Sequence, residues 1–89
     1  ALNFPAYAEL EAAFRAAALD EEARCVVVTG TDPAFCSGDD VVEILGAKPD
    51  PNAPKPAPVV RHQPTPAAMA ALECDKPMIA AVNGAAVGW

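Results

Sequence analysis

Two short apolar runs decide the fold of this chain: CVVVT at residues 25–29, ended by Gly30, and MIAAV at residues 78–82, followed by Asn83 and Gly84. Runs of this length that end at turn residues are typical of strands covered on both faces, as in a parallel sheet. The sequence therefore predicts two buried strands, each followed by a glycine-containing turn.

A helix is predicted before each strand. Residues 4–19 carry apolar side chains at helical spacing, Pro5 suits the first turn, and Glu11 with Arg15 forms a favourable i,i+4 pair. The apolar positions of this helix are Tyr7, Leu10, Phe14 and Ala17. A second helix is predicted over residues 65–73, with Met69 and Leu72 on its apolar stripe. Helices alternating with buried strands indicate an α/β fold.

The middle of the chain is predicted to be irregular. Asp39 or Asp40 is expected to cap a short helix that runs to about Leu45, since carboxylates are favoured at helix starts. Seven of the ten prolines then fall between Pro49 and Pro66. Residues 46–64 are therefore expected to form a surface loop, and a polyproline segment that binds a partner protein is an alternative function for it.

Composition excludes several classes of protein. The 89 residues are 53% hydrophobic and carry a formal net charge of -6, which argues against general affinity for nucleic acid. No apolar run approaches the ~20 residues of a membrane span, and no signal peptide opens the chain. The three cysteines are widely spaced and there is one histidine, His62, so neither a disulfide framework nor a metal site is expected. Reduced thiols fit a cytoplasmic protein.

The two loops that follow the strands are the candidate site. They span residues 34–40 (AFCSGDD) and residues 83–89 (NGAAVGW), and glycine in each permits close approach to the main chain. Backbone N–H groups from two such loops, aimed at one point, would bind a developing oxyanion. Spacing alone leaves open that these are ordinary turns between strands and helices.

Side-chain chemistry in the first loop has simpler explanations. Ser37 has no GxSxG surroundings and no histidine at an informative spacing, which argues against a nucleophilic serine. The thiol of Cys36 is placed before a helix start, yet such cysteines are usually packed residues. Asp39 and Asp40 are candidates for an acid/base pair, or for a helix cap and a solvated charge.

Four blocks of the sequence resemble the enoyl-CoA hydratase/isomerase (crotonase) superfamily. Residues 34–40 resemble its "FxxGxD" loop and residues 76–88 its "KPxIAAVNGxAxGGG" segment. Residues 1–3 resemble its "ALN" block and residues 26–30 its "VVLTG" strand. The blocks occur in family order and leave only residues 46–64 as a long stretch without a match.

The resemblance implies a superhelix of repeated ββα units, of which residues 1–89 would be the N-terminal portion of one domain, assembled as a trimer or hexamer. It implies an acyl-CoA thioester as substrate, with coenzyme A as part of that substrate and no separate cofactor. The thioester carbonyl would accept hydrogen bonds from the backbone N–H groups of Ser37 and Trp89. The residues implied to bind substrate are Ala34, Cys36, Ser37, Gly38, Asp39, Asp40, Gly88 and Trp89. Many family members have glycine where Trp89 stands, so its ring is expected to narrow the acyl pocket.

Hydration of a 2,3-enoyl-CoA is the reaction that the resemblance favours. An enoyl-CoA isomerase, or another enzyme of the superfamily that uses the same enolate, is the alternative. The family's acid/base carboxylates follow the "NGxAxGGG" segment, and two suitably placed glutamates there would indicate a hydratase. Without those carboxylates, residues 1–89 alone are expected to be inactive. With only two helices to cover both faces of the two strands, they are also expected to be poorly folded.

Overall fold

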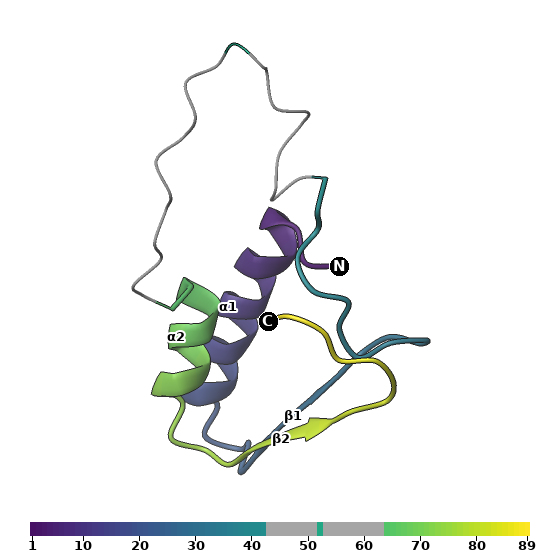
Figure 1. The fold of residues 1–89 in the computed structure, drawn as a ribbon. Coiled ribbons are helices and arrows are strands. Elements are labelled where there is room, and N and C mark those ends of the chain that lie inside the picture. Colours follow the sequence, from purple (N-terminus) through teal and green to yellow (C-terminus); the bar gives the residue numbers. More distant parts are fainter. Residues whose placement is uncertain (43–51, 53–63) are drawn as a thin grey trace.

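The computed structural model describes residues 1–42, 52 and 64–89, and its elements follow the order helix, strand, helix, strand. Helix α1 spans Phe4–Leu19, strand β1 Val26–Thr29, helix α2 Pro66–Glu73 and strand β2 Met78–Ala81. The two helices lie side by side and the strands pair as a two-stranded parallel sheet (Figure 1). The predicted α/β class is confirmed. The predicted loop at 46–64 and the end of the short helix at 43–45 lie outside the described residues, apart from Asn52 and Pro64.

Helix α1 has the bounds that the sequence predicted, and its start is capped. The Asn3 side chain accepts a hydrogen bond from the Ala6 backbone N–H at 2.9 Å, and Pro5 lies in the first turn. At the other end, the Lys76 ammonium donates to the carbonyl oxygens of Ala17, at 2.6 Å, and Asp20. A cation at the C-terminus of a helix satisfies carbonyls that have no partner within the helix.

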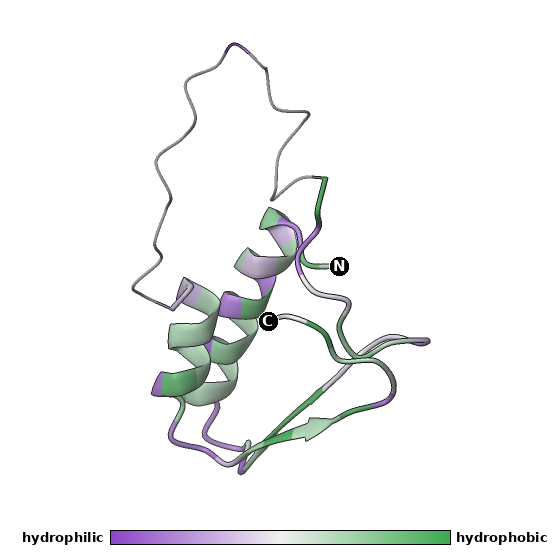
Figure 2. Ribbon diagram, in the orientation of Figure 1, coloured by the Kyte–Doolittle hydropathy of each residue, from purple (hydrophilic) through white to green (hydrophobic). Residues whose placement is uncertain are grey.

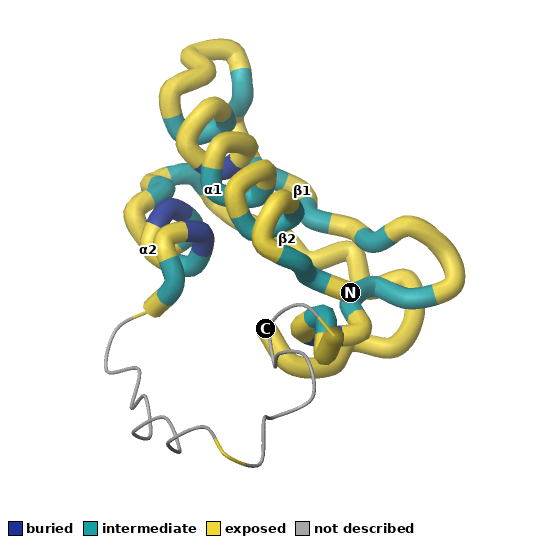
Figure 3. Tube along the Cα trace, turned by 90° about the horizontal axis from the view of Figure 1, so that it is seen from above, coloured by how far each residue is buried: buried dark blue, intermediate teal, exposed yellow. Residues whose placement is uncertain are grey.

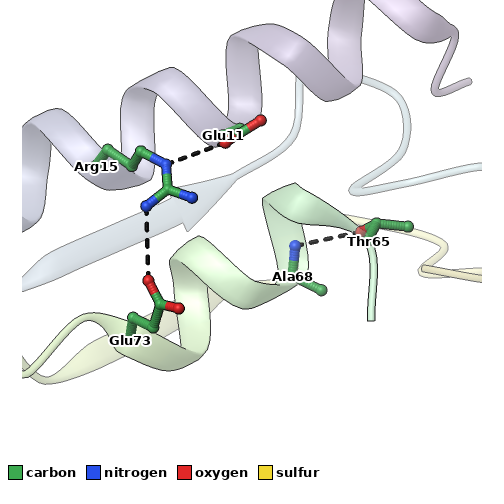
Figure 4. Close-up of polar contacts among 5 residues, drawn as sticks. All are labelled: Glu11, Arg15, Thr65, Ala68 and Glu73. Atoms are coloured by element: carbon green, nitrogen blue, oxygen red, sulfur yellow. Dashed lines mark hydrogen bonds and ion pairs between the residues drawn. The ribbon is translucent and has the colours of Figure 1, made fainter. Parts of the chain in front are cut away.

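Arg15 forms two ion pairs, one within α1 and one that connects α1 to α2 (Figure 4). The Arg15 guanidinium lies 3.0 Å from the Glu11 carboxylate, as the i,i+4 spacing predicted, and 3.5 Å from that of Glu73. Thr65 caps α2 by accepting from the Ala68 N–H at 3.2 Å. The prediction that Thr65 and Pro66 begin this helix is confirmed.

The buried apolar side chains belong to the two helices, on which Figure 3 shows dark blue segments. Among the described residues, Phe14 on α1 and Ala67 and Ala70 on α2 are the buried apolar side chains. The predicted apolar stripe of α2 was wrong, because Met69 and Leu72 are exposed, Leu72 by 73%. Small side chains let two helix backbones approach closely, and the alanine face therefore meets α1 while the larger residues point away.

The strands are aligned from end to end. Val26 pairs with Met78 and Thr29 with Ala81, and the Asn83 side chain continues the pairing beyond them. It accepts from the Gly30 N–H at 3.1 Å and donates to the Gly30 carbonyl at 3.0 Å. The Asn-Gly turn thereby joins the carboxyl ends of both strands.

The strands are not buried on both faces as the sequence predicted. Residues of β1 alternate between half-buried and exposed, and all four residues of β2 are exposed, although apolar residues run along both (Figure 2). The reason is that the described helices pack mainly on each other and the strands mainly on each other. An open cavity separates α1 from the sheet instead of a layer of packed side chains.

The thiols of Cys25, Cys36 and Cys74 are all free, as predicted. Cys36 and Cys74 are half-buried, whereas Cys25 is exposed. In the described part of the chain no helix has the length and apolar character that crossing a bilayer requires.

Candidate functional site

The two loops that follow the strands lie against each other. Residues Cys36 and Ala86 form an isolated parallel bridge, in which the Val87 N–H donates to the Cys36 carbonyl at 2.8 Å. The N–H groups of Phe35 and Cys36 both donate to the Ala85 carbonyl, each at 3.0 Å. The parallel sheet therefore brings the two predicted loops together at one edge.

Two glycines, one from each loop, also approach each other closely. Gly38 has a φ of 89° and Gly88 a φ of 74°, a region that L side chains rarely adopt. A Cβ atom placed on Gly88 would lie 3.0 Å from the Gly38 Cα. Because Ser37 precedes Gly38 and Trp89 follows Gly88, this contact brings the two expected oxyanion donors into neighbouring positions.

Ala34 and Phe35 pack against the glycines that end the strands. A Cβ on Gly30 would lie 2.3 Å from the Ala34 carbonyl oxygen, and one on Gly84 2.3 Å from the Pro33 carbonyl oxygen. These contacts are between backbones, so they require glycine at both positions. The start of the residue 34–40 loop is therefore held by both strand ends.

The far side of the first loop is held by the N-terminal segment. The Leu2 N–H donates to the Gly38 carbonyl and the Asp40 N–H donates to the Leu2 carbonyl, both at 2.8 Å. Leu2 and Asp39 thus form a second isolated parallel bridge. Gly38 is consequently buried between the N-terminal segment and the second loop.

The backbone N–H groups of Ser37 and Trp89 donate to no acceptor within residues 1–42 and 64–89. Those of Asp39, Ala86 and Gly88 in the same loops also donate to none, whereas the Phe35, Cys36, Asp40 and Val87 N–H groups all do. The Ser37 residue is exposed. An amide that is accessible and held by a bonded neighbour is available to a ligand oxygen.

Side chains of the first loop serve the loop itself. The Asp40 carboxylate accepts from the Val42 N–H at 3.0 Å across a turn at residues 41–42, and the Tyr7 hydroxyl donates to the Asp39 carboxylate. The Cys36 thiol accepts from the Gly38 N–H at 3.4 Å. These partners favour the cap and packing roles over an acid/base pair or a reactive thiol.

The Trp89 ring connects the second loop to both helices. It meets the Tyr7 ring edge to face, with centroids 5.9 Å apart and an interplanar angle of 87°. Its indole N–H donates to the Thr65 hydroxyl at 3.1 Å. The sequence pattern does not mark Tyr7 or Thr65 as part of the site. Tyr7 falls on the apolar stripe of its helix, and nothing in the linear spacing links it to Asp39 or Trp89.

An open cavity of about 710 Å³ lies between α1, the strands and the loops. Its walls are mainly apolar, and both Cys36 and Trp89 reach it from the loops. The other large apolar side chains that line it are Leu2, Leu10, Phe14, Val28, Phe35 and Met78. Among the described residues, no three histidine, cysteine or carboxylate side chains gather as they would around a metal ion.

Comparison with known proteins agrees with the motifs. The family model described as enoyl-CoA hydratase/isomerase matches residues 1–89. The chain is 36% identical over 88 residues to the enoyl-CoA hydratase AFT3-1 of Alternaria alternata, covering 99% of this chain and 28% of that protein. It is 42% identical over 81 residues to the probable enoyl-CoA hydratase EchA14 of Mycobacterium tuberculosis, covering 91% of this chain and 30% of that protein.

A probable enoyl-CoA hydratase of Rhodobacter capsulatus is 42% identical over 88 residues, which are 99% of this chain and 32% of that protein. The chain thus spans about a third or less of the length of these relatives. No solved structure matches the chain significantly. Because the family model covers every residue, the chain belongs to the enoyl-CoA hydratase/isomerase family.

Proposed function

We propose that this protein is an enoyl-CoA hydratase in which the backbone N–H groups of Ser37 and Trp89 form the oxyanion hole for a thioester carbonyl. The observation that carries the proposal is the contact between Gly38 and Gly88, which draws the two family motifs together. Both proposed donors lack a protein acceptor within the described residues. The relatives named enoyl-CoA hydratase support the reaction type.

The chemistry requires donors of this kind. When water adds to a 2,3-enoyl thioester, negative charge develops on the carbonyl oxygen as an enolate forms. Donors that are already in place stabilise that charge without rearranging, and one such donor typically contributes about 3 kcal/mol. The residues of this chain would bind and polarise the thioester, while water is activated by acid/base groups that we do not assign.

Substrate contacts are proposed for the remaining residues of the two loops. Ala34, Cys36, Gly38, Asp39 and Asp40 would border the coenzyme A portion of the substrate, and Gly88 and Trp89 the acyl portion. The support for this placement is the family motif on which each of them lies. Coenzyme A would enter as part of the substrate, and no separate cofactor is proposed.

Membership of the family also supports proposals about the fold, assembly, metabolic role and location of the protein at its full natural length. We propose the superhelix of ββα units, a trimer or a hexamer, a role in acyl-CoA and fatty acid metabolism, and a cytoplasmic location. Sedimentation of the purified protein would test the assembly. An isomerase of the same family is distinguished by shifting a 3-enoyl-CoA double bond rather than adding water to a 2-enoyl-CoA.

Substitution at Ser37 tests the role of its main chain. At full natural length, Ser37→Ala should retain kcat on a short 2-enoyl-CoA within about tenfold, because the N–H donor remains. Ser37→Pro removes that donor, and we expect kcat to fall by about 10² to 10³. Circular dichroism and size-exclusion chromatography would confirm that both variants are folded.

A nucleophilic serine gives the opposite result for alanine. It predicts near-complete inactivation of Ser37→Ala and a covalent acyl-serine in the wild-type enzyme, detectable by mass spectrometry. A folded but inactive Ser37→Ala protein would therefore exclude the backbone mechanism.

A further inference from the structure

Tyr7, in the second turn of α1, contacts both loops of the candidate site. Its hydroxyl donates to the Asp39 carboxylate, two residues after Ser37. Its ring meets the ring of Trp89 edge to face at 5.9 Å. One side chain thus contacts Trp89, which carries one proposed donor, and Asp39, which lies two residues after Ser37, the residue of the other donor.

Hydrogen bonds hold the start of α1 and the N-terminal segment next to Tyr7. Asn3 caps the start of helix α1, one turn before Tyr7. Leu2 forms backbone hydrogen bonds with the residues on both sides of Asp39. A site is held most accurately when its loops are fixed to regular elements by such secondary contacts. Tyr7 adds a side-chain connection from α1 to the first loop and a second one to Trp89.

The two contacts are of different physical kinds. A hydrogen bond to a carboxylate is stronger than one between neutral groups, and it fixes direction as well as distance. An edge-to-face aromatic pair fixes the position of one ring against another and tolerates loss of the hydroxyl. Substitutions at Tyr7 can therefore remove the first contact alone or both together.

We propose that Tyr7 is a positioning residue that couples the two halves of the oxyanion hole, holding the Ser37 loop through Asp39 and the second donor through the Trp89 ring. The proposal rests on the proposed function for its kinetic consequence. Its structural content, that the two loops are ordered by one tyrosine, is independent of the reaction.

The kinetic test uses the protein at full natural length with a short 2-enoyl-CoA. Tyr7→Phe should lower kcat about tenfold, the effect of one lost hydrogen bond to a charged group, with KM changed less than about twofold. Asp39→Ala should lower kcat by a similar factor. The double variant should be no slower than either single variant, because both remove the same contact. Asp39→Asn should recover most of the loss, since its Oδ1 still accepts from the hydroxyl.

A second measurement does not depend on activity. Hydrogen exchange followed by mass spectrometry should show that Tyr7→Leu raises exchange in both the 35–40 and 85–89 segments, where the Cys36 and Val87 amides are bonded. Tyr7→Phe, which keeps the ring contact, should raise it mainly in 35–40. Arg15→Gln, which breaks the ion pairs on the same helix, is the matched control and should change neither segment nor kcat.

The outcomes separate the two proposals. A wild-type protein that does not hydrate 2-enoyl-CoA overturns the proposed function, and exchange that rises in both segments in Tyr7→Leu would still support the coupling. When the wild type is active, any of three results overturns the coupling. The first is an unchanged kcat in Tyr7→Phe, and the second is effects of Tyr7→Phe and Asp39→Ala that multiply in the double variant. The third is hydrogen exchange in the 85–89 segment that Tyr7→Leu leaves unchanged.

Discussion

Replacing Gly84 or Gly38 with alanine separates two reasons for glycine in the loops. At Gly84 the backbone conformation is ordinary, but a Cβ would lie 2.3 Å from the Pro33 carbonyl oxygen and 3.1 Å from the Ala34 Cα. At Gly38 the reverse holds, because φ is 89° while the nearest atom, the Val87 carbonyl oxygen, would be 3.4 Å away. Gly84→Ala is therefore a steric perturbation and Gly38→Ala a conformational one.

The magnitudes follow from these contacts. The Gly84 methyl must push the 33–35 backbone away by about 1 Å to reach an ordinary separation of about 3.5 Å. That movement strains the two hydrogen bonds to the Ala85 carbonyl, each contributing about 1 kcal/mol, and adds about 1–3 kcal/mol for overpacking. We expect Gly84→Ala to lower the free energy of unfolding by about 3 kcal/mol, and Gly38→Ala by about 1–2 kcal/mol for the left-handed conformation.

Urea unfolding and initial hydration rates at full natural length measure both effects. Gly84→Ala should also lower kcat by about 10², the usual cost of a 1 Å displacement near the reacting atoms. Asparagine tolerates positive φ better than alanine, so Gly38→Asn should be less destabilising than Gly38→Ala, whereas Gly84→Asn should be no better than Gly84→Ala. Equal losses for alanine at both positions, or an advantage for asparagine at Gly84, would refute the steric assignment.

Three further outcomes are expected. Lys76→Met should lower the free energy of unfolding by about 1.5–3 kcal/mol in urea titrations, because the carbonyls of Ala17 and Asp20 lose a charged donor; no loss would show that water replaces the ammonium. Ala70→Leu, at a residue only 2% exposed, should cost about 1–3 kcal/mol by overpacking between the helices, and a neutral result would contradict the alanine interface. The 89-residue chain by itself should show no cooperative thermal transition as a monomer, since Val27, Ile79 and Val82 are all more than half exposed; a sharp calorimetric transition from a monomer would contradict this.

Local signals in the sequence predicted the elements well. Helix α1 begins and ends where its periodicity and Pro5 indicated, and α2 and both strands lie within a residue of their expected bounds. The meeting of the two loops was also predictable, because parallel strands place their carboxyl ends at the same edge of a sheet. Each of these inferences depends on neighbours in sequence or on one general rule of topology.

Inferences that depend on packing between elements were less successful. The hydrophobicity of Met69 and Leu72 suggested the buried face of α2, but the distance between helices is set by the smallest side chains, and Ala67 and Ala70 make the contact. The apolar strands suggested burial on both faces, yet a strand's composition does not determine whether another element covers it. The link from Tyr7 to Asp39 spans 32 residues, and no spacing rule predicts it.

Tryptophan at residue 89 is compatible with a donor role because that role belongs to the main chain. Among the described residues, only glycines have positive φ, so Trp89 adopts its conformation without the penalty that a side chain would meet at Gly88. The ring is directed to Tyr7 and Thr65, and these contacts hold the residue that carries the proposed donor. Glycine at the same position would leave that donor attached to a more flexible backbone. Under the proposed function, tryptophan in place of the family's glycine would hold the donor amide more firmly, through the contacts of its ring with Tyr7 and Thr65.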